Sequence, residues 1–280
     1  MHSLKSLSVL FKIMRLPAQL FIHLSPLGGV EVRDVLCELK SLDRKAWGEL
    51  LREVHRQLQE LQMFDILYPS HSEYPQSFYQ LKQPPVFLCA LGDLRLLAQQ
   101  KITVIGTRRP SLSFIDWMND QYFKFLRIND VVTVSGGAFG IDHLATQTAL
   151  FCGRSSVVIL PSGLSVSYPS HTRQWLKNPR VLSLSEYFPY ETVRNYHFVN
   201  RNRLLGSLSP HVLVVQCATK SGTMTTVRIA LDSGCEVLTV PSFPNLIESS
   251  GNIQLMKDGA QIIATAEDLS LALRLLAPNP

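Results

Sequence analysis

Five short polar segments, rich in Gly, Ser, Thr, Asn or Arg, each come after an apolar run typical of a β-strand. They are residues 106–111, 135–142, 161–171, 195–203 and 220–226. Glycine-rich turns and helix N-termini present N–H groups to anions, and guanidinium groups bind phosphate through paired hydrogen bonds. Each segment alone is equally explained as an ordinary turn or capped helix start. Together they predict a groove for an extended polyanion, because ligands bind beyond the carboxyl ends of parallel strands.

The first segment begins with Gly106 and Thr107, at the end of an apolar strand. Arg108 and Arg109 then present two cations, and Ser111 is suited to cap the next helix. A phosphate at this turn would meet both a helix N-terminus and a guanidinium fork. The alternative is a strand-to-helix turn with two solvated arginines.

The second segment has the spacing GGxxG rather than GxGxxG. No acidic ribose ligand ends the next strand, which argues against a dinucleotide site. We expect Asp142, in the first helical turn, to have a structural role, because a carboxylate there stabilises the helix dipole. The candidate anion-binding residues of this turn are Ser135, Gly136, Gly137, Phe139 and Gly140.

The other three segments combine amides, hydroxyl groups, aromatic rings and cations. These groups suit phosphate contact and base stacking. The alternatives are a surface loop, a helix start with a buried Phe198 and solvated arginines, and a capped helix. The candidate residues are Ser162, Gly163, Ser170, Arg173, His197, Asn200, Arg201, Arg203, Lys220 and Ser221.

Eight short apolar runs, most of them separated by helical segments, must position these turns. Continuous apolar strands alternating with helices predict an α/β fold with a doubly wound, mostly parallel sheet. The runs are 86–91, 102–105, 131–134, 156–160, 181–184, 212–215, 236–240 and 261–263. Three regions are expected: a small helical N-terminal domain over 1–62, a proline-punctuated connecting segment over 63–85, and the sheet-containing core over 86–280.

Composition places the chain among globular proteins. It has 280 residues, 46% of them hydrophobic, which excludes disordered and disulfide-stapled classes. The formal net charge of +5 comes from residues 101–210, which carry 12 basic and 6 acidic side chains. This basic block suggests an anionic partner, although a solvated basic face is an equal alternative.

The five cysteines are scattered without the spacing of a zinc site, and they indicate a reducing cytoplasm. We expect no metal and no cofactor. No apolar run is long enough to span a membrane, and Lys12, Arg15 and Pro17 interrupt any signal-peptide core.

In this order, the turns resemble the DprA/Smf family of bacterial DNA-processing proteins over residues 65–265. The matching elements are Ile105–Arg108, Ser135–Asp142, Ser162–Leu164 with Tyr168–Pro169, Ser185–Tyr187, Phe198–Arg203, Ser221–Thr223 and Gly251–Ala260. The N-terminal helices resemble the helical domain that often precedes this core. We expect no C-terminal winged-helix extension after it.

The resemblance implies an extended Rossmann-like core that binds single-stranded DNA without catalysis. It also implies a homodimer formed through the C-terminal half, and loading of the RecA recombinase during natural transformation. Residue by residue, the groove arginine of the family falls on Arg108, its phosphate-holding turn on 135–140, and its R-N-R element on Arg201 and Arg203.

The chain departs from the family pattern at four positions. Phe139 and Ser170 stand where lysines are common, Ser165 replaces an aspartate, and Val199 replaces a proline. Losing two cations would weaken the electrostatic part of DNA binding. Arg109, Arg173 and Lys220 are candidates to compensate. Phe139 would either stack on a base or cover the turn as a hydrophobic lid.

Two other functions compete with single-stranded DNA binding. One is a Rossmann-like nucleotide phosphoribohydrolase of the LOG type, whose P-G-G-x-G-T-x-x-E element carries a catalytic glutamate. The nearest text here, 221–226, has no glutamate in the following turn, which leaves Glu186 and Asp142 as groove-side carboxylates. The other is a degenerate family member that retains only protein partners.

Overall fold

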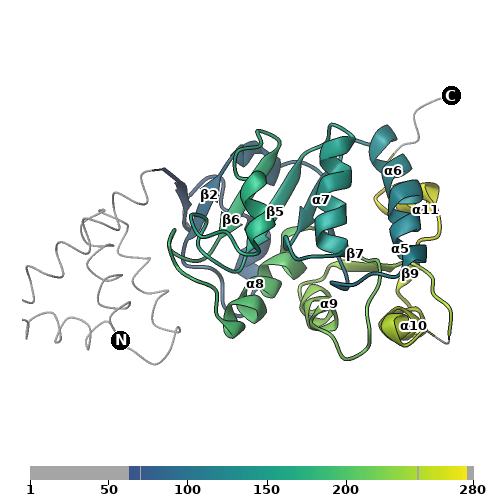
Figure 1. Cartoon of the computed structure of the whole chain (residues 1–280). Helices are drawn as coiled ribbons and strands as arrows, with labels where there is room; N and C mark the ends of the chain where they lie inside the picture. The colour runs from purple at the N-terminus through teal and green to yellow at the C-terminus, as the bar shows by residue number, and fades with distance from the viewer. Residues whose placement is uncertain (1–62, 70, 245, 276–280) are drawn as a thin grey trace, which may run out of the picture.

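A nine-stranded sheet forms the centre of the described part of the chain, residues 63–69, 71–244 and 246–275 of the computed structural model. The strand order is β1-β2-β6-β5-β4-β3-β7-β8-β9. From β6 to β9 in this order all neighbours are parallel, whereas β2 is antiparallel to both β1 and β6. The predicted α/β class with a mostly parallel sheet is confirmed (Figure 1).

The strands are short and most of their residues are buried. They are β1 (Asp65–Leu67), β2 (Leu88–Leu91), β3 (Lys101–Ile105), β4 (Val132–Ser135), β5 (Ser156–Leu160), β6 (Val181–Ser185), β7 (His211–Val214), β8 (Glu236–Thr239) and β9 (Gln261–Ile262). All eight apolar runs predicted from the sequence form strands, with bounds that shift by at most two residues at either end.

Helices follow most strands, as a doubly wound fold requires. The α-helices are α5 (Leu112–Trp117), α6 (Phe123–Ile128), α7 (Ile141–Phe151), α8 (Asn195–Leu208), α9 (Gly222–Asp232), α10 (Ser250–Lys257) and α11 (Ala266–Ala272). A π-helical turn, η3 (Met118–Tyr122), joins α5 to α6. The 3₁₀ helices are η1 (Gln76–Gln80), η2 (Leu94–Leu97), η4 (Ser170–Gln174) and η5 (Ile247–Ser249).

The helices cover both faces of the sheet, so an apolar core forms on each face, and a smaller third cluster lies around β5 and Trp175. Helices α8, α9 and α10 pack on one face, against side chains such as Val134 and Val214. Helices α5, α6, α7 and α11 pack on the other, against side chains such as Val104 and Val215. Successive strand residues point to opposite faces, so strands buried on both sides are apolar at nearly every position.

The strand order reverses between β3 and β7. The chain leaves β3 toward β4 on one side and returns later to β7 on the other. Loops that leave such neighbouring strands in opposite directions open a crevice at their carboxyl ends. The turns after β3 and β7, residues 106–111 and 216–221, therefore lie side by side.

Residues 63–85, expected as a connection, pack onto the sheet instead. They contribute the edge strand β1 and the buried core residues Tyr74, Phe78 and Leu81. A three-residue strand has too little alternation to be recognised from sequence, and the prolines conceal the apolar spacing around it. The expected helical domain over 1–62 lies outside the described residues. Within the described ranges, no helix is long and apolar enough to cross a membrane.

Candidate nucleic-acid interface

A crevice of about 390 Å³ lies at the point where the strand order reverses. Thr107 and Arg108 line it from the turn after β3, and Ser221 and Thr223 line it from the start of α9. Arg201 of α8 closes its floor. The expectation that the polar segments meet at one edge is confirmed for these turns. They bring hydroxyl groups, guanidinium groups and a helix N-terminus into one concave site, which suits an anionic ligand.

A buried set of polar contacts fixes the glycine-rich turn between β4 and α7. The N–H of Gly136 donates to Oδ2 of Asp142 over 3.1 Å. Arg201 Nη1 donates to the carbonyl oxygen of Ile159 over 2.9 Å and also to that of Gly136. Gly140, with φ +78°, completes the turn against Thr107 and Arg108, where a Cβ would collide with their backbone. The turn and the crevice are therefore positioned together.

The charges of this set have strongly perturbed pKa values. Burial raises the pKa of Asp142 to about 6, opposed by Arg201 and by backbone N–H groups. Burial lowers the pKa of Arg201 to about 10, opposed by Asp142. Asp142 has the structural role expected from the sequence, and it does more than stabilise the helix dipole, because it holds the turn through Gly136.

The two arginines of the R-N-R element have internal partners. Arg201 is only 5% exposed. Arg203 pairs with Glu186, and both side chains are mostly buried. From the sequence, Arg201 and Arg203 were expected to contact DNA. In the structure Arg201 joins α8 to the turn after β4 and to Ile159 within β5, and Arg203 joins α8 to Glu186 just after β6. Because α8 packs on the sheet, its inward-facing side chains are buried, and the charged ones among them need hydrogen-bond or ion-pair partners.

Arg108 is exposed at the crevice, and its neighbour Arg109 is exposed as well. The Thr107 N–H donates to the Gln216 carbonyl over 2.7 Å, and the Arg109 N–H donates to Thr107 Oγ1 over 3.2 Å, so the turn itself is fixed. The Arg108 guanidinium lies 5.4 Å from the centre of the Phe198 ring. A cation beside an aromatic ring can contact a phosphate while the ring stacks on the base of the same or the next nucleotide.

Phe139 projects from the outer side of the glycine-rich turn. Its ring is 56% exposed, and its centre lies 4.5 Å from that of His171 in η4. Tyr168, 42% exposed, packs edge-on against Phe198 with 5.9 Å between ring centres. Phe139 therefore offers a free aromatic surface to solvent while it covers His171. The geometry is compatible with both roles expected for it.

The remaining candidates divide between surface and interior. Exposed or half-buried at the carboxyl edge are Gly106, Ser170, Arg173, Asn200, Lys220 and Ser221. Buried are Ser135, Gly136, Gly137, Ser162, Gly163 and His197. The buried ones shape the loops: Ser162 Oγ accepts the Tyr168 N–H over 2.9 Å, and the His197 ring stacks on Tyr187 at 3.9 Å. Ser221 caps α9 by accepting the Met224 N–H.

Some residues of the site were not among those selected from the sequence. Phe198, Tyr168 and His143 join the exposed aromatic surface, and Glu248 of η5 reaches the crevice. The aromatic residues within 195–203 could have indicated Phe198 as a site residue. Glu248 could not be found in this way, because it reaches the crevice through the loop after β8. In the described part of the chain, no group of three or more His, Cys, Asp and Glu side chains is arranged to hold a metal ion.

Gly136 tests how far the buried contacts determine stability. A Cβ at this position would lie 2.1 Å from Arg201 Nη1 and 2.8 Å from Asp142 Oδ2. We expect Gly136→Ala to lower the free energy of unfolding by about 2–4 kcal/mol, because it displaces a buried guanidinium from its partners. Chemical denaturation measures this. Gly222→Ala is the matched control, since nothing lies within 4 Å of its Cβ, and an equal loss in both variants would contradict the account.

His143 and His171 predict a pH dependence of stability. Burial lowers the pKa of both imidazoles below the ordinary value of 6.5. As the pH falls through 6.5, the unfolded chain takes up protons before the folded protein does, so these residues destabilise the fold on acidification. We expect the melting temperature of the His143→Gln, His171→Gln double variant to fall less between pH 7.5 and 5.5 than that of the unchanged protein. Parallel curves would contradict this.

Comparison with known proteins identifies the family. The model of the family described as DNA recombination-mediator protein A matches residues 65–274. The DNA processing protein DprA of Bacillus subtilis is 32% identical over 203 residues, which cover 71% of this chain and 68% of that protein.

Two solved structures are similar in fold. The X-ray structure of DprA from Streptococcus pneumoniae superposes with a TM-score of 0.77 at 27% identity, covering 97% of this chain and 92% of that one. DNA processing protein A from Helicobacter pylori, whose structure was described for its single-stranded DNA binding mode, gives a TM-score of 0.66 at 31% identity, covering 75% and 95%. The chain belongs to the DprA/Smf family of DNA-processing proteins, the family of DNA recombination-mediator protein A.

Proposed function

We propose that the chain binds single-stranded DNA across the carboxyl edge of its sheet. The observation that carries this is the crevice between β3 and β7, where exposed Arg108 lies over the Phe198 ring beside the N-terminus of α9. A single strand offers both phosphates and unstacked bases to such a surface. The binding mode of the Helicobacter pylori relative supports the same ligand.

Arginine and lysine side chains at other positions supply the positive charge of this surface. With Phe139 and Ser170 where the family commonly has lysines, positive charge at this edge comes from Arg108, Arg109 and Lys220. Arg173 is partly engaged, since its Nη2 donates to the Val166 carbonyl over 3.2 Å. Fewer phosphate contacts and more aromatic area give binding that depends less on salt and more on stacking.

We further propose that the bound strand is protected in the cytoplasm and passed to the RecA recombinase during natural transformation, and that the protein acts as a homodimer. The chain belongs to a family named for recombination mediation, which supports a role in passing the bound DNA to a recombinase. Each phosphate contact adds separately to affinity, so binding through a few cations is weaker. Weaker binding suits single-stranded DNA that must later be released.

Arg108 tests the DNA-binding proposal. We expect Arg108→Ala to weaken binding of a fluorescent oligothymidylate about tenfold and to lower the slope of log affinity against log salt by about one unit, because one phosphate contact is lost. Fluorescence anisotropy at several salt concentrations measures both. Arg228→Ala, an exposed arginine on α9 outside the crevice, should change neither value. A wild-type slope in Arg108→Ala would remove this residue from the site.

We also propose that the site is not catalytic. Asp142 accepts the Gly136 N–H and Glu186 pairs with Arg203, so both carboxylates have structural contacts that account for their positions. We expect a nucleoside monophosphate to remain intact on prolonged incubation with the protein, as judged by chromatography of the free base. Release of base that is abolished by Glu248→Gln, the exposed carboxylate at the crevice, would instead favour a phosphoribohydrolase.

A further inference from the structure

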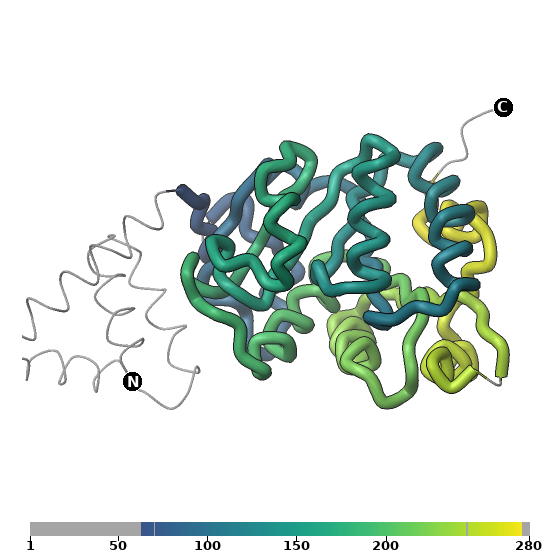
Figure 2. The backbone as a smooth tube through the Cα atoms, in the orientation of Figure 1, coloured from purple at the N-terminus to yellow at the C-terminus, as the bar shows by residue number. Residues whose placement is uncertain are grey.

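A second and larger hollow runs beside α7, away from the crevice. Its volume is about 860 Å³, and it lies between α7, the η3–α6 segment and the chain just after η4. Figure 2 shows α7 in front of the sheet, with the chain after β5 on one side of it and α6 on the other. None of its lining side chains is ionisable. The hollow therefore suits an uncharged portion of a ligand.

The lining combines amides with aromatic surface. Asn119, Gln147 and Gln174 expose amide groups to it, and Phe151 is 83% exposed at its edge, 6.0 Å from the Phe123 ring. Amide side chains pair with the edges of nucleobases and aromatic rings stack on their faces. An uncharged heteroaromatic ring with several donors and acceptors matches this lining better than an aliphatic side chain does.

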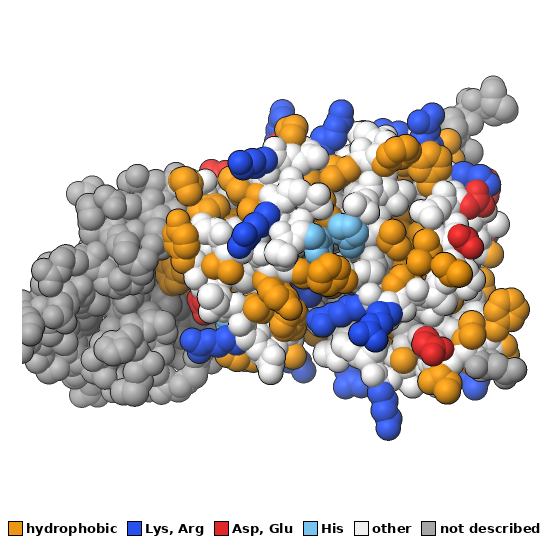
Figure 3. Space-filling view, in the orientation of Figure 1, with side chains coloured by type: hydrophobic (Ala, Val, Ile, Leu, Met, Phe, Trp, Pro, Cys, Tyr) orange, Lys and Arg blue, Asp and Glu red, His pale blue; other side chains and the backbone are white. Residues whose placement is uncertain are grey.

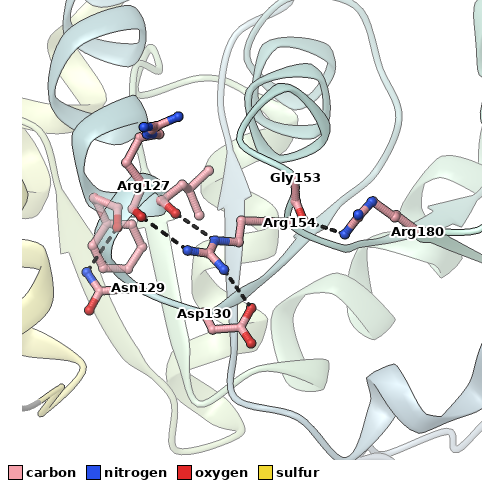
Figure 4. A network of polar contacts seen from close by, with 8 residues as sticks. Arg127, Asn129, Asp130, Gly153, Arg154 and Arg180 are labelled. Carbon is pink, nitrogen blue, oxygen red and sulfur yellow. Dashed lines mark hydrogen bonds and ion pairs between the residues drawn. The ribbon is translucent and has the colours of Figure 1, made fainter.

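A group of arginines lies at the amino edge of the sheet, just beyond Phe151, the last residue of α7 and part of the lining of the hollow. Arg154, just beyond α7, donates to the Leu126 carbonyl over 2.8 Å and pairs with Asp130 over 3.3 Å. Arg180 donates to the Gly153 carbonyl, and Arg127 lies in the same network (Figure 4). The Arg154 guanidinium pairs with Asp130, and Arg127 joins the network through its backbone carbonyl, which accepts from Arg154. The side chains of Arg127 and Arg180 are exposed, so the group of three arginines beside one aspartate keeps an excess of positive charge.

Aromatic contacts connect this hollow to the crevice side of the molecule. Phe139 lies on His171, the His171 ring packs edge-on against Trp175 at 5.4 Å, and Trp175 lines the hollow. Figure 3 shows histidine and hydrophobic side chains near the centre of this face, with Lys and Arg side chains along its upper and lower margins. An uncharged, partly aromatic surface along α7, here called the α7 track, thus lies between two margins that carry basic side chains.

We propose that single-stranded DNA bound at Arg108 continues along α7, with its bases in this hollow and its phosphates reaching the Arg127–Arg154–Arg180 group. The proposal rests on the proposed function. Helix α7 has 11 residues and rises about 16 Å, and a stacked strand advances about 3.4 Å per nucleotide, so the track adds about five nucleotides to the site.

The test compares oligothymidylates of about 5 and about 15 nucleotides. The track adds about five nucleotides to the site, so the longer oligonucleotide can occupy both the crevice and the track, and the shorter one cannot. The hollow variant is Gln147→Ala with Phe151→Ala. The margin variant is Arg127→Glu with Arg180→Glu, at the two exposed positions of the arginine group. We expect each to weaken binding of the long oligonucleotide about tenfold, as loss of stacking or of phosphate contacts would. Binding of the short one should stay within about twofold of wild type.

Controls separate this proposal from the function on which it rests. Arg228→Glu with Lys257→Glu, exposed on α9 and α10, should leave both lengths unaffected. Arg108→Ala should weaken both lengths, and its failure to do so would contradict the proposed function instead. Unchanged binding of the long oligonucleotide by the hollow and margin variants would overturn the α7 track, and would leave the hollow to a protein partner. Equal losses for the two lengths would overturn it as well.

Discussion

The buried contacts among Gly136, Asp142 and Arg201 determine how the carboxyl edge of the sheet is arranged. One guanidinium joins the turn after β4 to the end of β5, and one carboxylate fixes that same turn from the first turn of α7. A buried cation requires acceptors around it, and two carbonyl oxygens with a nearby carboxylate provide them. Gly136 is required because any side chain there would occupy the position of Arg201.

This arrangement divides the basic residues into three groups. Arg201 and Arg203 stabilise the interior, Arg108 and Arg109 face solvent at the carboxyl edge, and the Arg154 network lies at the opposite edge. The net charge of residues 101–210 therefore overstates the charge at any one site. The glycine-rich turn, fixed from inside, presents Phe139 outward, so aromatic surface stands where a further cation was expected from the family pattern.

Much of the fold could be predicted from the sequence. Strands buried on both faces must be apolar at nearly every position, and glycine-rich turns must follow them, so the strands and the edge that carries the turns were both recognisable. The strand β1 was not, because Asp65–Leu67 pairs only with β2 and its three residues have no periodicity. Its place in the sheet depends on partners distant in the sequence.

By itself the sequence determined the family, the order of strands and turns, and the group of turns among which a ligand site would lie. The tertiary structure decided which of their side chains are free to bind. Arg108 and Arg201 are equally basic and both lie in polar motifs, yet one is exposed and the other buried. The reason is that burial depends on how α8 packs against the β4 and β5 loops, and no local spacing specifies which acceptors a distant helix will bring to a guanidinium group.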